Sequence, residues 1–298
     1  MQKLTAPLRD RYQAKFRKLS LHQEPLFIDI ESQLHYHSMK RLSILLLLSS
    51  TFSPYFSIAT AVASDRRFTY VYEATTCAQG EIEIETWATW KTRRDGASRA
   101  NQWDFRHEFE YGLTDRTSLA LYVADWKVLD NRAGGDYGAQ AVYQDTAVEV
   151  IHNLTNPVMD LVGSALYGEV KLGDQKFEIE SKLLLQKNFG PIVLAYNVGV
   201  EAEWEGDRFG YFNEASGEFM ESFGISYQFS PKFFLGGEFL HEVGLDEWTE
   251  VGDIVIYAGP NASFRIDRFF VTTTAMFQLT GMTDEPDFQL RTICGIHF

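Results

Sequence analysis

The sequence has few cysteines, no excess of positive charge and, beyond residue 63, no long apolar run. Zinc sites need several ligands close together in sequence, and Cys77 and Cys294 are far apart, so they form no metal motif. Tracts rich in Met and His are also lacking, and we expect neither a metal nor another cofactor. No apolar stretch after residue 63 is long enough for a membrane helix. Any membrane insertion of this part must therefore use strands.

A segment near the N-terminus has the pattern of an export signal. Met39 is followed by the basic residues Lys40 and Arg41 and the apolar run 42–48, and the small residues 61–63 come later. A positive start, a short apolar core and an A-x-A site predict a Sec signal peptide over 39–63. Residues 1–38 are then either an upstream start-codon assignment or an extended n-region.

The chain after this signal is strongly acidic. The first 63 residues hold eight of the 27 basic and four of the 41 acidic residues, so residues 64–298 carry 19 basic and 37 acidic ones. Nucleic acid is excluded as a partner because it requires a basic surface. Aromatic residues make up 14% of the chain, enough to supply the girdles of a membrane barrel.

The segment 287–298 alternates between apolar or small residues and a second set that includes Gln289, Arg291 and His297. A strand with one face in lipid and one in a lumen has this pattern, whereas an edge strand of a soluble sandwich is the alternative. A terminal aromatic resembles the assembly signal that the barrel-assembly machinery reads in outer-membrane proteins. The residues of this candidate signal are Phe288, Leu290, Thr292, Cys294, Ile296 and Phe298.

Eleven further segments are predicted as strands, and most alternate in the same way, whereas 117–128 is partly apolar on both faces and its register is ambiguous. We predict an all-β fold, an antiparallel up-and-down transmembrane β-barrel of about 12 strands over 80–298. Residues 64–79 form either a periplasmic segment or a plug. Pro260 predicts a bulge or an interrupted ladder in its strand. The other predicted strands are 80–91, 102–112, 117–128, 139–152, 161–172, 176–188, 192–204, 216–229, 233–243, 252–264 and 269–279.

The connections between these strands alternate in length, with 173–175 as the exception. Short periplasmic turns and longer outer loops are typical of a membrane barrel. The mostly short connections are 113–116, 153–160, 188–191, 230–232 and 265–268, and the longer, polar ones are 92–101, 129–138, 205–215, 244–251 and 280–286.

Acids gather on the face of the strands that is not apolar. They indicate either a pore that favours cations or a lumen filled by Glu–Arg and Glu–Lys pairs. Arg291 could pair with an acid of the first strand, and Cys77 could form a disulfide with Cys294 if the barrel closes. The candidate lumen-lining residues are Glu81, Glu83, Glu85, Asp104, Arg106, Glu108, Glu110, Glu169, Lys171, Lys182, Glu201, Glu203, Glu238 and Arg291.

Three functions fit this architecture. The first is a passive channel for small, cationic solutes, and the second is a closed structural or adhesion barrel that makes contacts through 129–138 and 205–215. The third is a barrel hydrolase, for which His241 beside Glu242 is the one plausible catalytic position. No serine is marked as its partner, so we expect no enzyme activity and no catalytic residue.

The stretches 110–119 (EYGLTDRTSL) and 226–235 (SYQFSPKFFL) share a strand–turn–strand cadence. The cadence resembles hairpins of outer-membrane transporter barrels of the phenol-degradation-associated type and of related uncharacterised Gram-negative barrels. The resemblance covers most of 68–298 as a pattern. It implies an outer-membrane location, outer-membrane lipid as a partner and passive transport of small solutes, and it supplies no binding or catalytic residue.

Overall fold

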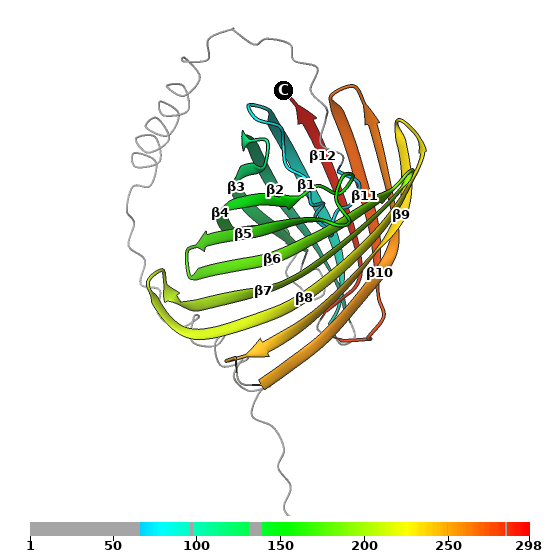
Figure 1. Ribbon diagram of the computed structural model, residues 1–298. Coiled ribbons are helices and arrows are strands. Elements are labelled where there is room, and N and C mark those ends of the chain that lie inside the picture. The colour runs from blue at the N-terminus through cyan, green and yellow to red at the C-terminus, as the bar shows by residue number, and fades with distance from the viewer. Residues whose placement is uncertain (1–65, 96–97, 131–138, 249, 284) are drawn as a thin grey trace, which may run out of the picture. The chain divides into compact units, whose positions relative to one another are not determined.

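The computed structural model describes residues 66–95, 98–130, 139–248, 250–283 and 285–298. Its strands form one closed antiparallel barrel in which β12 pairs with β1, as Figure 1 shows. The prediction of an all-β, 12-strand up-and-down barrel is confirmed, whereas the predicted export signal and residues 1–38 lie outside the described residues. The strands are β1 (Ile82–Asp95), β2 (Ser98–Thr114), β3 (Thr117–Asp130), β4 (Ala139–Thr155), β5 (Gly163–Gly173), β6 (Lys176–Phe189), β7 (Ile192–Arg208), β8 (Tyr211–Ser230), β9 (Phe233–Asp246), β10 (Glu250–Ile266), β11 (Phe269–Gln278) and β12 (Pro286–His297).

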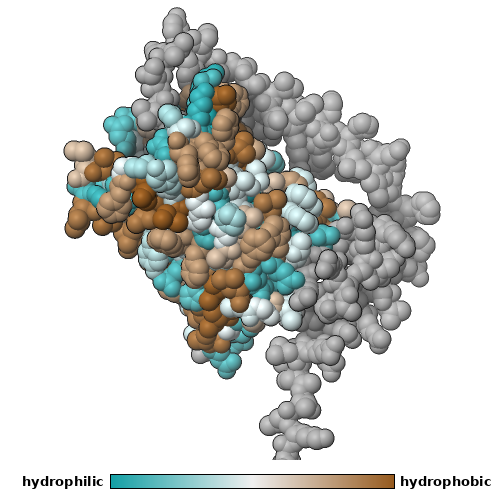
Figure 2. Space-filling model, turned by 90° about the vertical axis from the view of Figure 1, so that its right-hand side faces the viewer, coloured by the Kyte–Doolittle hydropathy of each residue, from teal (hydrophilic) through white to brown (hydrophobic). Residues whose placement is uncertain are grey.

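The two faces of the wall differ as the alternation requires. On β6, Ile179 and Leu183 are exposed on the outside, while Glu180 and Leu184, which directly follow them, are buried inside. Figure 2 shows brown, apolar side chains gathered over the outer wall. Lipid offers no hydrogen bonds, so a closed ladder with an apolar outer face is the arrangement that a bilayer permits for strands. None of the described residues forms a helix long and apolar enough to cross a membrane.

The seam between β1 and β12 closes through a regular ladder in which Glu85 faces Gly295 and Ala88 faces Thr292. Glycine is required at 295 because an added Cβ would lie 2.2 Å from the ring of Phe270. Aromatic rings cross this seam in a continuous row, with neighbouring centroids 4.3–6.2 Å apart. The row consists of Phe277, Phe288, Trp90, Trp103, Phe105 and Trp126.

Most of the predicted long connections are wrong. The stretch predicted as the loop 205–215 consists mainly of β7 and β8, which extend to Arg208 and from Tyr211 and leave a tight turn at Gly210 with φ 84°. The ends of β1, β2 and β9 likewise occupy much of the predicted loops around them. Strand ends that extend past the lipid need no apolar face, so their polar residues resemble a loop.

Two irregularities lie where the sequence was ambiguous. Pro260 keeps its place opposite Gly237 of β9, but neither it nor Gly259 pairs with β11, so the ladder is interrupted without a bulge. In β3, both Tyr122 and Asp125 face inward, because the register shifts between them. This shift exchanges the faces along β3 and explains why both of its faces look partly apolar.

Residues 66–79, called here the lumen segment, lie inside the barrel ahead of β1. Phe68 and Val71 pack against Val193 of β7. Farther along, Ala74 belongs to a buried cluster with Tyr167. These contacts fill the interior where β4 to β7 pass the segment, and they divide the space within the barrel into separate parts.

Candidate functional site

Glu238 on β9 is the main anchor of the lumen segment. Its carboxylate accepts hydrogen bonds from three successive backbone N–H groups, those of Thr69 (2.9 Å), Tyr70 (2.7 Å) and Val71 (3.0 Å). The hydroxyl of Thr274 donates to the same carboxylate. A carboxylate bound by several donors in a closed interior is among the stronger polar contacts in proteins, so this buried glutamate fixes the position of the segment.

Uncharged side chains bind other backbone groups of the segment. Asn197 accepts from the Tyr72 N–H (2.7 Å) and donates to its carbonyl (2.9 Å). Gln186 accepts from the N–H of Ala74 (2.8 Å). The segment belongs to no strand, yet the wall supplies partners for backbone groups that would otherwise be buried without one.

The lumen segment also carries an internal ion pair. Arg67 donates to Glu73 from its backbone N–H and from its guanidinium, each at 2.7 Å. Burial raises the pKa of Glu73, and the charge of Arg67 acts in the opposite direction. The pair draws the two ends of this stretch together and gives the segment a compact form.

The segment separates two cavities. One, called here the charged cavity, has a volume of 490 Å³ and is lined by Tyr70 and Tyr72 on the side of the segment. The other has a volume of 370 Å³ and is lined by Ala74 and Thr75 of the segment and by the turns that follow β2 and β4. Because the segment lines both cavities, it lies between them.

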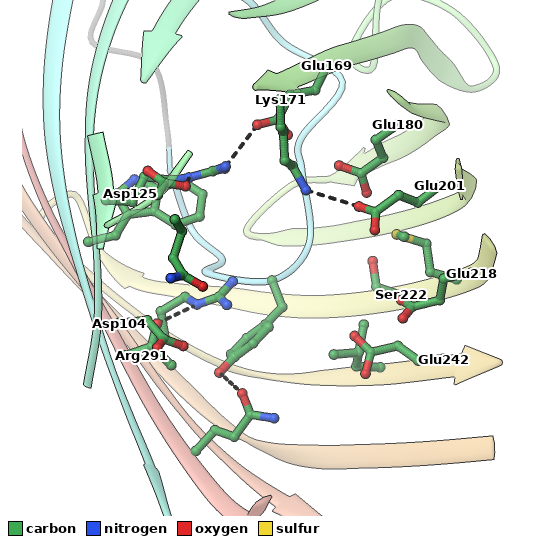
Figure 3. A pocket seen from close by; sticks show the side chains of 18 of the residues that line it. Asp104, Asp125, Glu169, Lys171, Glu180, Glu201, Glu218, Ser222, Glu242 and Arg291 are labelled. Carbon is green, nitrogen blue, oxygen red and sulfur yellow. Dashed lines mark hydrogen bonds and ion pairs between the residues drawn. The ribbon is translucent and has the colours of Figure 1, made fainter. Parts of the chain in front are cut away.

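Opposite walls of the charged cavity carry different groups. Glu201, Glu218 and Glu242 lie along one wall, and Asp125 and Arg291 lie across from them (Figure 3). The first three come from β7, β8 and β9, the strands that bound this side of the cavity.

Basic residues bind several acids of the charged cavity, and Arg106 and Lys171 are examples. Arg106 lies 2.6 Å from Asp125 and 2.8 Å from Glu169, with its guanidinium 3.9 Å from the centre of the Tyr122 ring. Lys171 lies 3.0 Å from Glu201. These ion pairs neutralise part of the charge of the cavity, and a paired ion costs less free energy to bury than an isolated one.

Acids outnumber bases around the charged cavity. Glu218 and Glu242 have no ion-pair partner among the described residues. The cavity therefore has a net negative lining, which favours cations over anions. Its acids are Asp104, Asp125, Asp145, Glu169, Glu180, Glu201, Glu218, Glu221, Glu242 and Glu285, and its basic residues are Lys91, Arg106, Lys127, Lys171, Lys182 and Arg291.

The structure separates the fourteen candidate lumen residues into two groups. Seven line the charged cavity. These are Asp104, Arg106, Glu169, Lys171, Lys182, Glu201 and Arg291.

The other seven lie elsewhere and have separate contacts. Glu83 and Glu110 line a small third cavity, and Glu238 binds the lumen segment. Glu85 pairs with Arg66 at 3.2 Å. The remaining three are Glu81, which accepts from the backbone of Ala78, Glu203, which pairs with Lys176, and the buried Glu108.

Two pairings that the sequence left open are not formed. Arg291 binds the hydroxyl of Thr89 on β1 (3.0 Å) and the carbonyl of Thr69 (3.2 Å), not an acid of the first strand. The cysteines form no disulfide, because Cys77 is buried inside the wall while Cys294 is exposed on its outer face.

His241 points outward, away from Glu242, so the two do not form one site. Its Nδ1 lies 3.1 Å from Glu221, which also accepts from the hydroxyl of Tyr196. The adjacent Glu242 lines the charged cavity instead. Neighbours in a strand face opposite sides of the wall, which explains the separation.

Sequence reasoning missed several residues of the site, notably Tyr70, Tyr72, Asp125, Glu218 and Glu242. The last two could have been found, because they occupy inward positions of β8 and β9, which the sequence predicts as strands. The two tyrosines lie outside any strand and offered no periodic signal. Asp125 was hidden by the register shift in β3.

Together the fold and the interior define a transmembrane β-barrel whose lumen holds its own N-terminal segment. The chain belongs to a family of unknown function (DUF6662), whose model matches residues 60–292. No curated protein matches the sequence.

One solved structure in particular shares the fold. The COG4313 outer membrane channel from Pseudomonas putida F1 is 13% identical, with a TM-score of 0.57 over 76% of this chain and 98% of that one. The translocator domain of the autotransporter NalP from Neisseria meningitidis is 11% identical, with a TM-score of 0.48 over 90% and 98%. The NanC porin is 7% identical, with a TM-score of 0.48 over 72% and 98%.

Proposed function

We propose that this protein is an outer-membrane channel for small cationic solutes, closed in the described state by its own lumen segment. The charged cavity carries the proposal, because it has a volume of 490 Å³, an excess of acids and Tyr70 and Tyr72 of the lumen segment in its lining. A solute of suitable charge could enter it, and only displacement of the segment would give passage to the cavity on the other side.

Three further features support this reading. The apolar outer wall suits the lipid that surrounds such a barrel. The closing strand has the alternation of an outer-membrane protein that the barrel-assembly machinery inserts. The fold is shared with a barrel that is described as an outer membrane channel.

The test is conductance in planar bilayers with the full chain and with a variant that lacks residues 66–76. We expect small, intermittent currents from the full chain and a several-fold larger, steady current from the variant. With a KCl gradient, the reversal potential should indicate preference for K⁺.

A closed structural barrel is the second candidate, and the filled lumen favours it. If the shortened variant folds, as judged by heat-modifiable migration in gels, and still passes no current, the channel proposal is wrong and the structural reading stands. A steady current without cation preference would overturn the solute class alone.

A further inference from the structure

A second cluster of chemically reactive side chains lies near the start of β1, apart from the charged cavity. Cys77 comes from the lumen segment, Glu83 from β1 and Glu110 from β2. The Sγ atom of Cys77 and one carboxylate oxygen of each glutamate all lie within 4.8 Å of one another. Cys77 and Glu83 are each 1% exposed, and the three residues line a cavity of 40 Å³.

A buried histidine points at this cluster. His297 of β12 is 1% exposed, and its Nδ1 lies 3.0 Å from an oxygen of Glu83. The geometry makes no hydrogen bond there, and Nε2 has no hydrogen-bond partner among the described residues. A buried ring nitrogen left without a partner is costly, so an imidazole in this state favours a ligand that would engage it.

Carboxylates also face one another across this part of the sheet. In the β1–β2 ladder, Glu83 lies directly opposite Glu110, and Glu85 lies opposite Glu108. Like charges in direct cross-strand positions destabilise a sheet. Arg66 pairs with Glu85 at 3.2 Å and so serves the second of these pairs. In the first pair, Glu83 accepts from the thiol of Cys77 at 3.7 Å and contacts His297 at 3.0 Å.

We propose that Cys77, Glu83, Glu110 and His297 form a binding site for one divalent transition-metal ion of the Zn²⁺ class. A thiolate, an imidazole and carboxylates are the ligands that Zn²⁺ takes in four-coordinate sites. Hard ions such as Mg²⁺ and Ca²⁺ take oxygen ligands and have no use for the sulfur. Binding would release the proton of the thiol and offset the charge of the two glutamates.

Such an ion would join the lumen segment to three strands at once. Cys77 is the single ligand that the segment contributes, while the other three belong to β1, β2 and β12. The site does not depend on the channel proposal, since a bound ion could link the lumen segment to the strands of a permanently closed barrel in the same way.

Cadmium substitution tests the site in the full chain, purified in detergent and stripped with EDTA. We expect one Cd²⁺ per chain, with the ultraviolet charge-transfer band of a thiolate–metal bond. Cys77→Ser should abolish the band and weaken binding at least tenfold, and Cys294→Ser is the matched control that should retain both. No stoichiometric binding by the stripped protein, or the same band in both variants, would overturn the proposal.

The other ligands have their own control. Glu83→Gln, Glu110→Gln and His297→Gln should each weaken Zn²⁺ binding about tenfold or more, whereas Glu214→Gln, at an exposed position of β8, should leave it unchanged. Zn²⁺ should also raise the melting temperature of the unmodified chain and not that of Cys77→Ser, because an ion that binds the folded state alone stabilises it. Equal stabilisation of both chains would count against a role for Cys77.

Discussion

The two halves of the lumen are both lined by inward-facing glutamates, yet they use them differently. Where the lumen segment fills the barrel, the carboxylate of Glu238 accepts hydrogen bonds from backbone N–H groups and holds the segment in place. In the charged cavity, Glu218 and Glu242 face open space, and Glu201 shares Lys171 with other acids. The comparison teaches that strand alternation fixes which way a glutamate points, while a segment remote in sequence decides what it binds.

The largest change, in the free energy of unfolding, should come from replacing Arg106, which binds two acids of the charged cavity. Arg106→Gln would leave Glu169 and Asp125 without their partner. Breaking a buried ion pair by removing one member costs about 3–5 kcal/mol in the free energy of unfolding. Urea unfolding in detergent, followed by tryptophan fluorescence, measures the loss.

Arg116→Gln is the matched control for this change, since Arg116 is exposed in the turn after β2. Its loss should lower the free energy of unfolding by no more than about 1 kcal/mol. Equal losses in the two variants would show that the ion pairs of the cavity contribute nothing beyond a surface charge.

A somewhat smaller effect is expected at Glu238. Glu238→Gln keeps the shape of the side chain but turns an amide N–H₂ toward donors of the lumen segment. A hydrogen bond to a charged group contributes about 1.5–3 kcal/mol, so release of the segment should become more frequent by a factor on the order of 100.

Cys77 reports that release, because it is 1% exposed while the segment is bound. In a Cys294→Ser background with EDTA present, maleimide should label Cys77 faster in Glu238→Gln than in the unmodified chain. Glu214→Gln supplies the control with the same loss of charge at an exposed site. Identical labelling rates in all three chains would mean that Glu238 does not retain the segment.

The smallest expected effect concerns selectivity. Replacing Glu218 and Glu242 together by Gln removes two carboxylates that lack an ion-pair partner among the described residues, so the fold should tolerate the change. In the chain without residues 66–76, the preference for K⁺ over Cl⁻ should fall a few-fold, as read from the reversal potential. An unchanged potential would place the selectivity outside the charged cavity.

Much of this architecture could be predicted from alternation alone. β1 and β6 show the reason. One face of each strand contacts lipid and the other faces the lumen, so apolar and polar residues are assigned to the two faces without ambiguity. Prediction failed where that constraint ends. Strand ends beyond the lipid resembled loops, and the shifted register of β3 concealed Asp125.

The interior of the site was less accessible to sequence reasoning. The role of Glu238 depends on Thr69, Tyr70 and Val71, and the role of Asn197 depends on Tyr72. These contacts join a segment without periodicity to strands far along the chain. No local pattern marks a glutamate that binds a backbone rather than a solute, so the two uses of the same residue type become distinct only in three dimensions.

The anchoring of residues 66–79 also bears on the order in which the protein folds. The bond from Thr69 to Glu238 closes a separation of 169 residues, and the bonds that the carbonyls of Arg67 and Arg66 accept from Asn261 and Thr272 span more. Contacts so remote in the chain form slowly, because the entropy of closing a long loop is lost before they are gained. Residues 66–79 are synthesised before any strand. They should therefore reach their native position last, after the strands around them have closed into the barrel.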